Sequence, residues 1–182
     1  GVTVDIGGYY LEVNGTLNVW GTDSEKVFLL SDENPSQGPA ISGQNNIVVA
    51  YGNPSVNLQN AVLDNTSLFG LSTASEATVT INSCILVNSA VDVLGSTSVS
   101  SSYLTCAVRS QGNVSFVGNT FLGGVEVSGE FVVSGNYIVN VGGAAVTAWG
   151  SGAVSGNIIV DSTYGVTQDD KTTLSATVER NL

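Results

Sequence analysis

Histidine and methionine are absent from this sequence, and only four of its 182 residues are basic against fifteen acidic ones. Without histidine, Ser-His-Asp and Cys-His catalysis is excluded, and so are most zinc and copper sites. The net charge of −11 disfavours nucleic acid and anionic membrane surfaces as partners, because both are bound through clusters of Lys and Arg. It also disfavours acidic polysaccharides unless calcium intervenes. We therefore expect no cofactor, no resident metal and no nucleic-acid partner.

Long apolar and helical patterns are missing as well. No run of 18 apolar residues occurs, so the sequence predicts no membrane insertion. No stretch of ten residues follows a helical apolar period. Short segments such as 125–127, 131–133 and 157–160 are instead rich in β-branched residues and bounded by Gly or Ser-Gly, which is typical of short strands. The sequence therefore predicts an all-β protein.

What the sequence does contain is a short motif that recurs seven times, once every 17 to 24 residues. A polar anchor is preceded three positions earlier by an apolar residue in six of the seven copies, and an apolar residue follows two positions after the first six anchors. The anchors are Asn60, Asn82, Ser102, Asn119, Asn136, Asn157 and Asn181. A period near 20 with one fixed polar site indicates a solenoid in which each repeat is one coil.

Parallel stacking of such coils places equivalent side chains ~4.8 Å apart along the axis. The anchor amides are then expected to form a ladder, because an Asn side chain both donates and accepts hydrogen bonds and can satisfy a buried turn. The motif predicts one right-handed parallel β-helix domain over residues 1–182, with eight or nine coils. We expect one interior column to be formed by Val62, Leu104, Phe121, Ile138 and Ile159.

Several phrases resemble right-handed parallel β-helix proteins of the pectin-lyase-like type. They are the Ser-Gly-Asn-x-Ile phrases at 134–138 and 155–159, the Val-Gly-Asn-x-Phe phrase at 117–121, and the opening segment 11–22, in which Gly-Thr-Leu leads to a Gly-Thr turn. The resemblance covers nearly the whole chain and implies the fold. It does not select a function, because that fold includes lyases, hydrolases, tail spikes, adhesins and inert spacers.

Catalytic candidates are few. The resemblance draws attention to Asp169 and Asp170, because related polygalacturonases use neighbouring Asp pairs. However, no third Asp one coil away and no Arg-x-Lys phrase accompany them, so we expect an exposed loop. Arg109 is the only cation in the middle of the solenoid, and a surface ion pair with Asp92 is more plausible than proton abstraction. The sequence predicts no enzyme, with a polysaccharide lyase or glycoside hydrolase as the alternative.

Carbohydrate contact is the remaining binding hypothesis. Tyr103 and Tyr137 each follow an anchor by one residue, so they are expected to face outward, two coils or ~10 Å apart. They form either a sugar-stacking strip or two ordinary exposed aromatics.

Five residues, three asparagines and two cysteines, are candidates for covalent modification. Sequons at Asn14, Asn65 and Asn113 are either glycosylation sites or chance matches in a chain rich in Asn, Ser and Thr. Cys84 and Cys106 are about one coil apart, but they follow their anchors by two and four residues. A disulfide and two buried thiols therefore both remain open.

The composition, with little charge and much Ser, Thr, Asn and Gly, predicts an extracellular or cell-surface location. The expected function is a non-enzymatic structural β-solenoid, which is a surface shaft, an adhesin module or a filament subunit. The alternative is a carbohydrate-binding or carbohydrate-active module. Neither end of the chain shows a capping pattern. The expected partners are therefore other copies of this chain, stacked head to tail, and carbohydrate; an excised fragment and a capped monomer are the alternatives to a filament.

Overall fold

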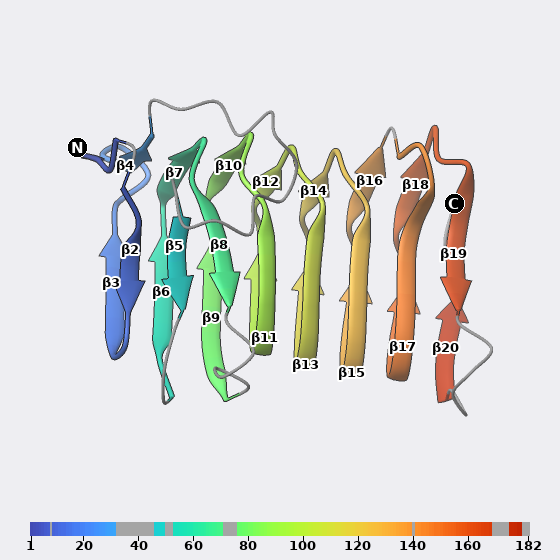
Figure 1. The fold of residues 1–182 in the computed structure, drawn as a ribbon. Helices are drawn as coiled ribbons and strands as arrows, with labels where there is room; N and C mark the ends of the chain where they lie inside the picture. Colours follow the sequence, from blue (N-terminus) through green and yellow to red (C-terminus); the bar gives the residue numbers. More distant parts are fainter. Residues whose placement is uncertain are drawn as a thin grey trace.

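The computed structural model describes residues 1–7, 9–31, 46–49, 53–70, 76–139, 141–168 and 175–179. All regular elements in these ranges are strands, and they wind into a parallel β-solenoid of about seven turns (Figure 1). The predicted all-β solenoid is confirmed, but eight or nine coils was too many. The early coils are longer than the motif implied: Asn18 and Asn57 hydrogen-bond between adjacent coils across 39 residues, whereas Ser102 and Asn119 do so across 17.

Sheet A is one wall of the solenoid and contains eight parallel strands that follow one another in chain order. Its strands are β1 (Val2–Asp5), β4 (Val27–Leu30), β7 (Ala61–Asp64), β10 (Ile85–Val87), β12 (Tyr103–Leu104), β14 (Thr120–Phe121), β16 (Tyr137–Val139) and β18 (Ile158–Val160). From β10 onwards each strand has only two or three residues. The outer face of sheet A is therefore narrow.

Sheet B contains the other twelve strands and has two series in the first coils. One series is β2 (Leu11–Val13), β5 (Asn46–Val49) and β8 (Ser67–Gly70), and the other is β3 (Thr16–Trp20), β6 (Ser55–Gln59) and β9 (Ala77–Asn82). Later coils join the two into long strands, namely β11 (Val91–Ser100), β13 (Val108–Val117), β15 (Val125–Ser134) and β17 (Ala144–Ser155). Beyond them lie β19 (Tyr164–Gln168) and β20 (Ser175–Glu179), which both pair with β17.

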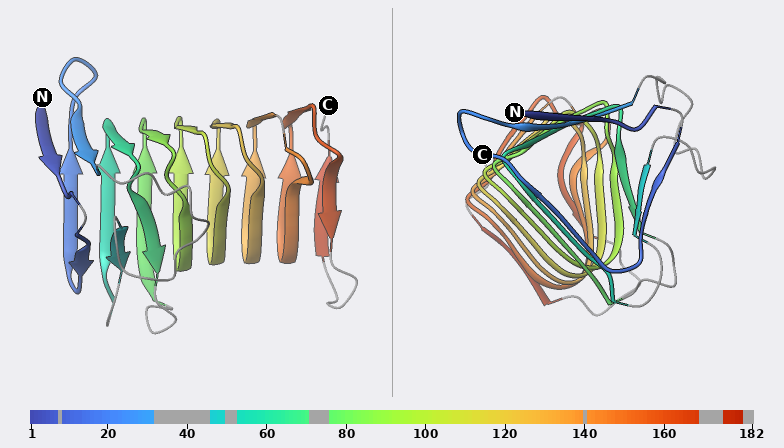
Figure 2. Two further views of the ribbon diagram at one scale, coloured as in Figure 1. Left: turned by 45° about the horizontal axis from the view of Figure 1, so that its top comes forward. Right: turned by 90° about the vertical axis from the view of Figure 1, so that its left-hand side faces the viewer.

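Viewed along the axis, the coils superimpose on a three-sided outline (Figure 2). Sheet A forms one side and the two series of sheet B form the other two. The long strands pair in parallel without slippage, for example β13 with β15 over ten consecutive residues. Equivalent side chains therefore lie directly above one another along the whole length of the later coils.

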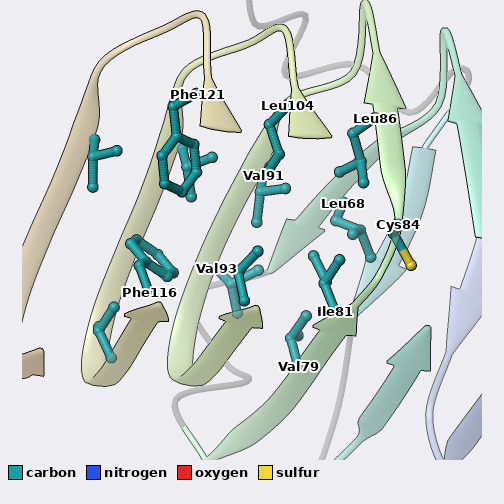
Figure 3. Close-up of a cluster of buried hydrophobic side chains, with 14 of the residues drawn as sticks. Leu68, Val79, Ile81, Cys84, Leu86, Val91, Val93, Leu104, Phe116 and Phe121 are labelled. Carbon is teal, nitrogen blue, oxygen red and sulfur yellow. The ribbon is translucent and has the colours of Figure 1, made fainter. Parts of the chain in front are cut away.

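Apolar columns fill the interior. On sheet B, fully buried residues in register are Leu58, Ile81, Val99, Phe116, Val133 and Val154. On sheet A, the residues that face them are Leu63, Leu86, Leu104, Phe121 and Ile138, with Ile159 partly buried at the end. Figure 3 shows side chains from both sheets pointing into this shared interior. The rings of Phe116 and Phe121 lie 5.9 Å apart, centroid to centroid, at an interplanar angle of 54°.

One member of the predicted column is wrong. Val62 lies on the outer face of β7 and is only half-buried, while Leu63 is fully buried and is in register with Leu86. Because successive strand residues point to opposite faces, a register error of one residue moved Val62 to the wrong side.

Candidate functional site

The recurring polar position of the motif lies at the turn where sheet B leads into sheet A. The residues at this position in successive coils are Ala61, Cys84, Ser102, Asn119, Asn136 and Asn157. From Cys84 onwards, each side chain accepts a hydrogen bond from the backbone N–H of the equivalent residue in the preceding coil. We call the five residues Cys84, Ser102, Asn119, Asn136 and Asn157 the turn stack.

The three asparagines of the turn stack also bond to one another. Asn119 Nδ2 donates to Asn136 Oδ1 at 3.0 Å, and Asn136 Nδ2 donates to Asn157 Oδ1 at 2.9 Å. The second hydrogen of each Nδ2 reaches a backbone carbonyl of the preceding coil; Asn136, for example, donates to Phe116 O at 2.9 Å. All three amides are at most 2% exposed. They satisfy buried backbone groups that would otherwise lack partners.

Two predicted ladder residues lie outside this column, and a third lies outside the described residues. Asn60 precedes the stack position by one residue and has a φ of 49°, while Asn82 precedes Cys84 by two. The side chain of Asn82 instead accepts hydrogen bonds from the hydroxyls of Ser83 and Ser100. Asn60 was misplaced because Asn is also favoured in left-handed turn conformations, so an Asn alone does not identify the stack. At the Asn82 turn the left-handed residue is Ser83, with a φ of 53°. Asn181 is the residue that the structure does not describe.

Glycine recurs at a second position, which the sequence analysis missed. Gly95, Gly112, Gly129 and Gly150, here called the glycine stack, have φ values between 97° and 135° and mark the bend in each long strand. A Cβ at Gly129 would lie 2.5 Å from Gly112 O, so no side chain fits. Each of these glycines precedes a turn-stack residue by seven positions, and this fixed offset could have identified them.

Both cysteines are free thiols. Cys84 Sγ donates to Asn82 O at 3.2 Å and accepts from Ala61 N at 3.4 Å, so the thiol acts as a member of the turn stack. Cys84 is level with Ser102, four residues before Cys106 in the next coil, and the structure forms no disulfide between them. Burial raises the pKa of both thiols, that of Cys106 to about 11, so both are protonated at neutral pH.

The charged side chains in the middle of the solenoid form a row across three coils. Arg109 donates to Glu126 at 2.9 Å, one coil further on, rather than forming its contact with Asp92 as predicted. Asp92 is level with Arg109 on the other side, and burial raises the pKa of its carboxyl above the ordinary value, although the Arg109 charge acts in the opposite direction. Asp169 and Asp170 lie outside the described residues.

Tyr103 and Tyr137 lie on the outer face of sheet A, 39% and 43% exposed, with Thr120 in register between them. Among the sequons, Asn14 and Asn113 are exposed. Asn65 is half-buried, and its Nδ2 donates to Ser31 O at 3.4 Å. Asn14 Nδ2 also donates a hydrogen bond, to Glu12 Oε1 at 2.8 Å, but at an exposed site. By exposure of the side chain, Asn14 and Asn113 are therefore the more accessible acceptors.

Within the described ranges, no group of three or more Asp, Glu or Cys side chains is placed to share a metal ion. The same part of the chain has no helix with the length and hydropathy needed to cross a membrane. Comparisons with protein-family models, curated proteins and solved structures gave no match, so no family assigns a function to these residues.

Proposed function

We propose that this protein is a non-enzymatic structural β-solenoid, a rigid shaft that holds other groups at a distance at the cell surface or outside the cell. The observation that supports this most strongly is what the repeated side chains contact. Every member of the turn stack bonds to its own neighbouring coil, and every glycine of the glycine stack accommodates the backbone of the preceding coil. The recurring residues maintain the coil itself.

Rigidity follows from how the coils are joined. Adjacent long strands share ladders of eight to ten paired residues, and the apolar columns continue through them without a break. In a solenoid each repeat is stabilised mainly by its two neighbours, so the number of coils can change while the cross-section is kept. A protein with this property is suited to setting a distance.

The outer surface of sheet B is polar and carries little charge, which supports an extracellular location. One outward row consists of Ser55, Thr78, Ser96, Asn113, Glu130 and Ser151, which carries one charge in six residues. Two sequon asparagines are exposed, and the whole chain has a net charge of −11. The phrases that resemble the pectin-lyase-like type support placing the shaft among proteins of that kind.

Assembly into filaments is a variant of the same proposal. Val2 and Val4 of β1 are 60% and 44% exposed, and β1 pairs with β4 along one edge. A further coil, either from the same chain or from another copy, would pair with the opposite edge by β-augmentation. Sedimentation over a dilution series measures whether copies of the protein stack in this way.

The shaft is tested by changing its length. Spin labels on Ser55→Cys and Ser151→Cys, in a Cys84→Ser, Cys106→Ser background, are five strand spacings or ~24 Å apart. Duplicating residues 120–136, which form one coil, is expected to lengthen this distance by ~4.8 Å and to keep the distribution narrow. The unduplicated pair is the control.

A broadened distribution, or loss of folding on duplication, would contradict a rigid extensible shaft. Release of reducing ends or unsaturated products from a polysaccharide by the purified protein would contradict the non-enzymatic assignment.

A further inference from the structure

The outer face of sheet A differs from the polar surface of sheet B. The side chains at its centre, one per coil and in register from β4 to β18, are Phe28, Val62, Ile85, Tyr103, Thr120, Tyr137 and Ile158. Six of the seven are apolar or aromatic, and four of them are 37% to 45% exposed. We call this row the sheet A strip. The remaining three, Val62, Ile85 and Thr120, are partly exposed. A largely apolar row that reaches the surface in every coil indicates an interaction surface.

The strip is narrow, and its width limits what can bind. With strand spacings of ~4.8 Å and one or two outward residues per strand, it measures about 29 Å by about 10 Å, on the order of 300 Å². A stable interface between folded proteins needs about 800 Å² from each partner. The backbone between β10 and β16 is paired on both sides, so a peptide cannot add as a further strand there. A thin linear chain that lies along the axis fits this shape.

Tyr103 and Tyr137 suit the rings of such a chain. They are two strand spacings apart, ~9.6 Å, and the smaller Thr120 between them leaves both phenol rings accessible. Aromatic faces pack against apolar C–H surfaces, and the phenol hydroxyls remain available as hydrogen-bond partners. This spacing lets the two rings contact alternate units of an extended sugar chain.

An open groove beside the strip supplies polar groups. Its lining includes Asp23, Lys26, Ser83, Ser101, Tyr103 and Thr120. Asn60 also lines it, 7% exposed, and its Oδ1 has no hydrogen-bond partner in the structure. A ligand rich in hydroxyl groups can form hydrogen bonds with the polar side chains that line this groove.

The charges of the groove and of the whole chain favour neutral polysaccharides over acidic ones. Asp23 and Lys26 balance one another in the groove, and the whole chain carries −11. An acidic polysaccharide would be repelled by the surrounding surface, whereas a neutral one would not.

We propose that the sheet A strip and its groove bind a neutral, extended polysaccharide, whose rings stack on Tyr103 and Tyr137 along the solenoid axis. This binding site goes beyond the shaft and would attach it to a glycan surface. Its failure would leave the length experiment on the shaft unaffected.

The test is affinity electrophoresis of the full chain in gels containing hydroxyethyl cellulose, arabinoxylan, galactomannan or laminarin, with polygalacturonate as the acidic probe. We expect at least one neutral glycan to retard the protein and polygalacturonate not to. Tyr103→Ala and Tyr137→Ala are each expected to weaken binding about tenfold, and the double variant to abolish it. Tyr164→Ala is the matched control, because Tyr164 is 62% exposed on β19, outside the strip. Circular dichroism and the unfolding midpoint of each variant report whether the fold is retained.

Three results would overturn the proposal. They are the absence of retardation by all four neutral glycans, equal loss of binding in Tyr164→Ala, and retention of full binding in the double variant. Concentration-dependent self-association that disappears in the double variant would instead assign the strip to a second copy of this chain.

Discussion

The coils on the two sides of Ser102 are built differently, although they share one cross-section. Later coils repeat every 17 or 21 residues, with long strands, an Asn amide at each turn and a Gly at each bend. In the coils before β11 sheet B is divided into strands of three to six residues, and Ala61 and Cys84 occupy the turn position; β11 is already a long strand with Gly95 at its bend, and Ser102 follows it. The apolar columns run through both regions without a break. The comparison indicates that stacked apolar side chains define the solenoid, while amides and glycines make its coils short and regular.

The largest expected effect comes from changing the apolar columns, which the earlier and later coils share. Ile138→Asp and Leu86→Asp place an unpaired charge in the same fully buried column, one in a later coil and one in an earlier coil. Each is expected to destabilise the domain by more than about 4 kcal/mol or to prevent folding, because the buried carboxylate cannot be hydrated. Chemical denaturation monitored by circular dichroism measures this.

Tyr137→Asp is the control for that pair, since Tyr137 is the outward neighbour of Ile138 and should tolerate the charge. If Leu86→Asp folded normally, the apolar column would not be the common basis of the two regions.

The next effect concerns the bends of the later coils. Gly129→Ala is expected to cost about 2–3 kcal/mol, because Ala is strained at a φ of 97° and its Cβ would meet Gly112 O. Gly142→Ala is the matched control, with no atom within 4 Å of its added Cβ, and should change stability by less than about 0.5 kcal/mol. Equal unfolding midpoints for the two variants would show that the glycine stack is not required.

Removal of one asparagine amide from the turn stack is expected to destabilise the protein as much as Gly129→Ala does, or somewhat less. Asn136→Ala leaves Asn119 N, Asn119 Nδ2 and Phe116 O without their partner, and we expect a loss of about 2 kcal/mol. Asn82→Ala, at a position outside the turn stack, should cost less than about 1 kcal/mol. Urea unfolding of both variants makes the comparison, and a larger loss for Asn82→Ala would reverse the assignment of the stack.

The differences between earlier and later coils also explain which ladder residues could be predicted correctly from the sequence. Asn119, Asn136 and Asn157 were placed in one column because their spacing, the preceding Gly and the following apolar residue all agree. The same pattern failed for Asn60, because an Asn also stabilises the left-handed residue just before the stack, and a shift of one residue exchanges the faces of the strand.

Two further features could not be derived from the motif alone. Cys84 replaces an amide in the turn stack with a thiol, and a motif defined by a polar residue does not include Cys. The sheet A strip arises only when residues up to 34 positions apart, Phe28 and Val62, are brought into register. The outward tyrosines were therefore predicted, but not the apolar row that connects them to Phe28 and Ile158.

The smallest expected effect asks whether the amide column can be extended toward the earlier coils. Ser102→Asn keeps a side-chain acceptor for Cys84 N and adds an Nδ2 that can donate to Asn119 Oδ1 and to Ile81 O, as Asn119 donates to Asn136 and Val99. We expect a gain of up to about 1 kcal/mol, measured as a higher urea midpoint with an unchanged slope. Ser102→Ala is the control, and it should destabilise the protein because Cys84 N loses its acceptor. A gain for Ser102→Asn would mean that the early coils lack amides by residue choice alone. A loss would mean that the turn narrows before Ser102 and excludes the longer side chain, so the two regions differ in backbone geometry as well as in sequence.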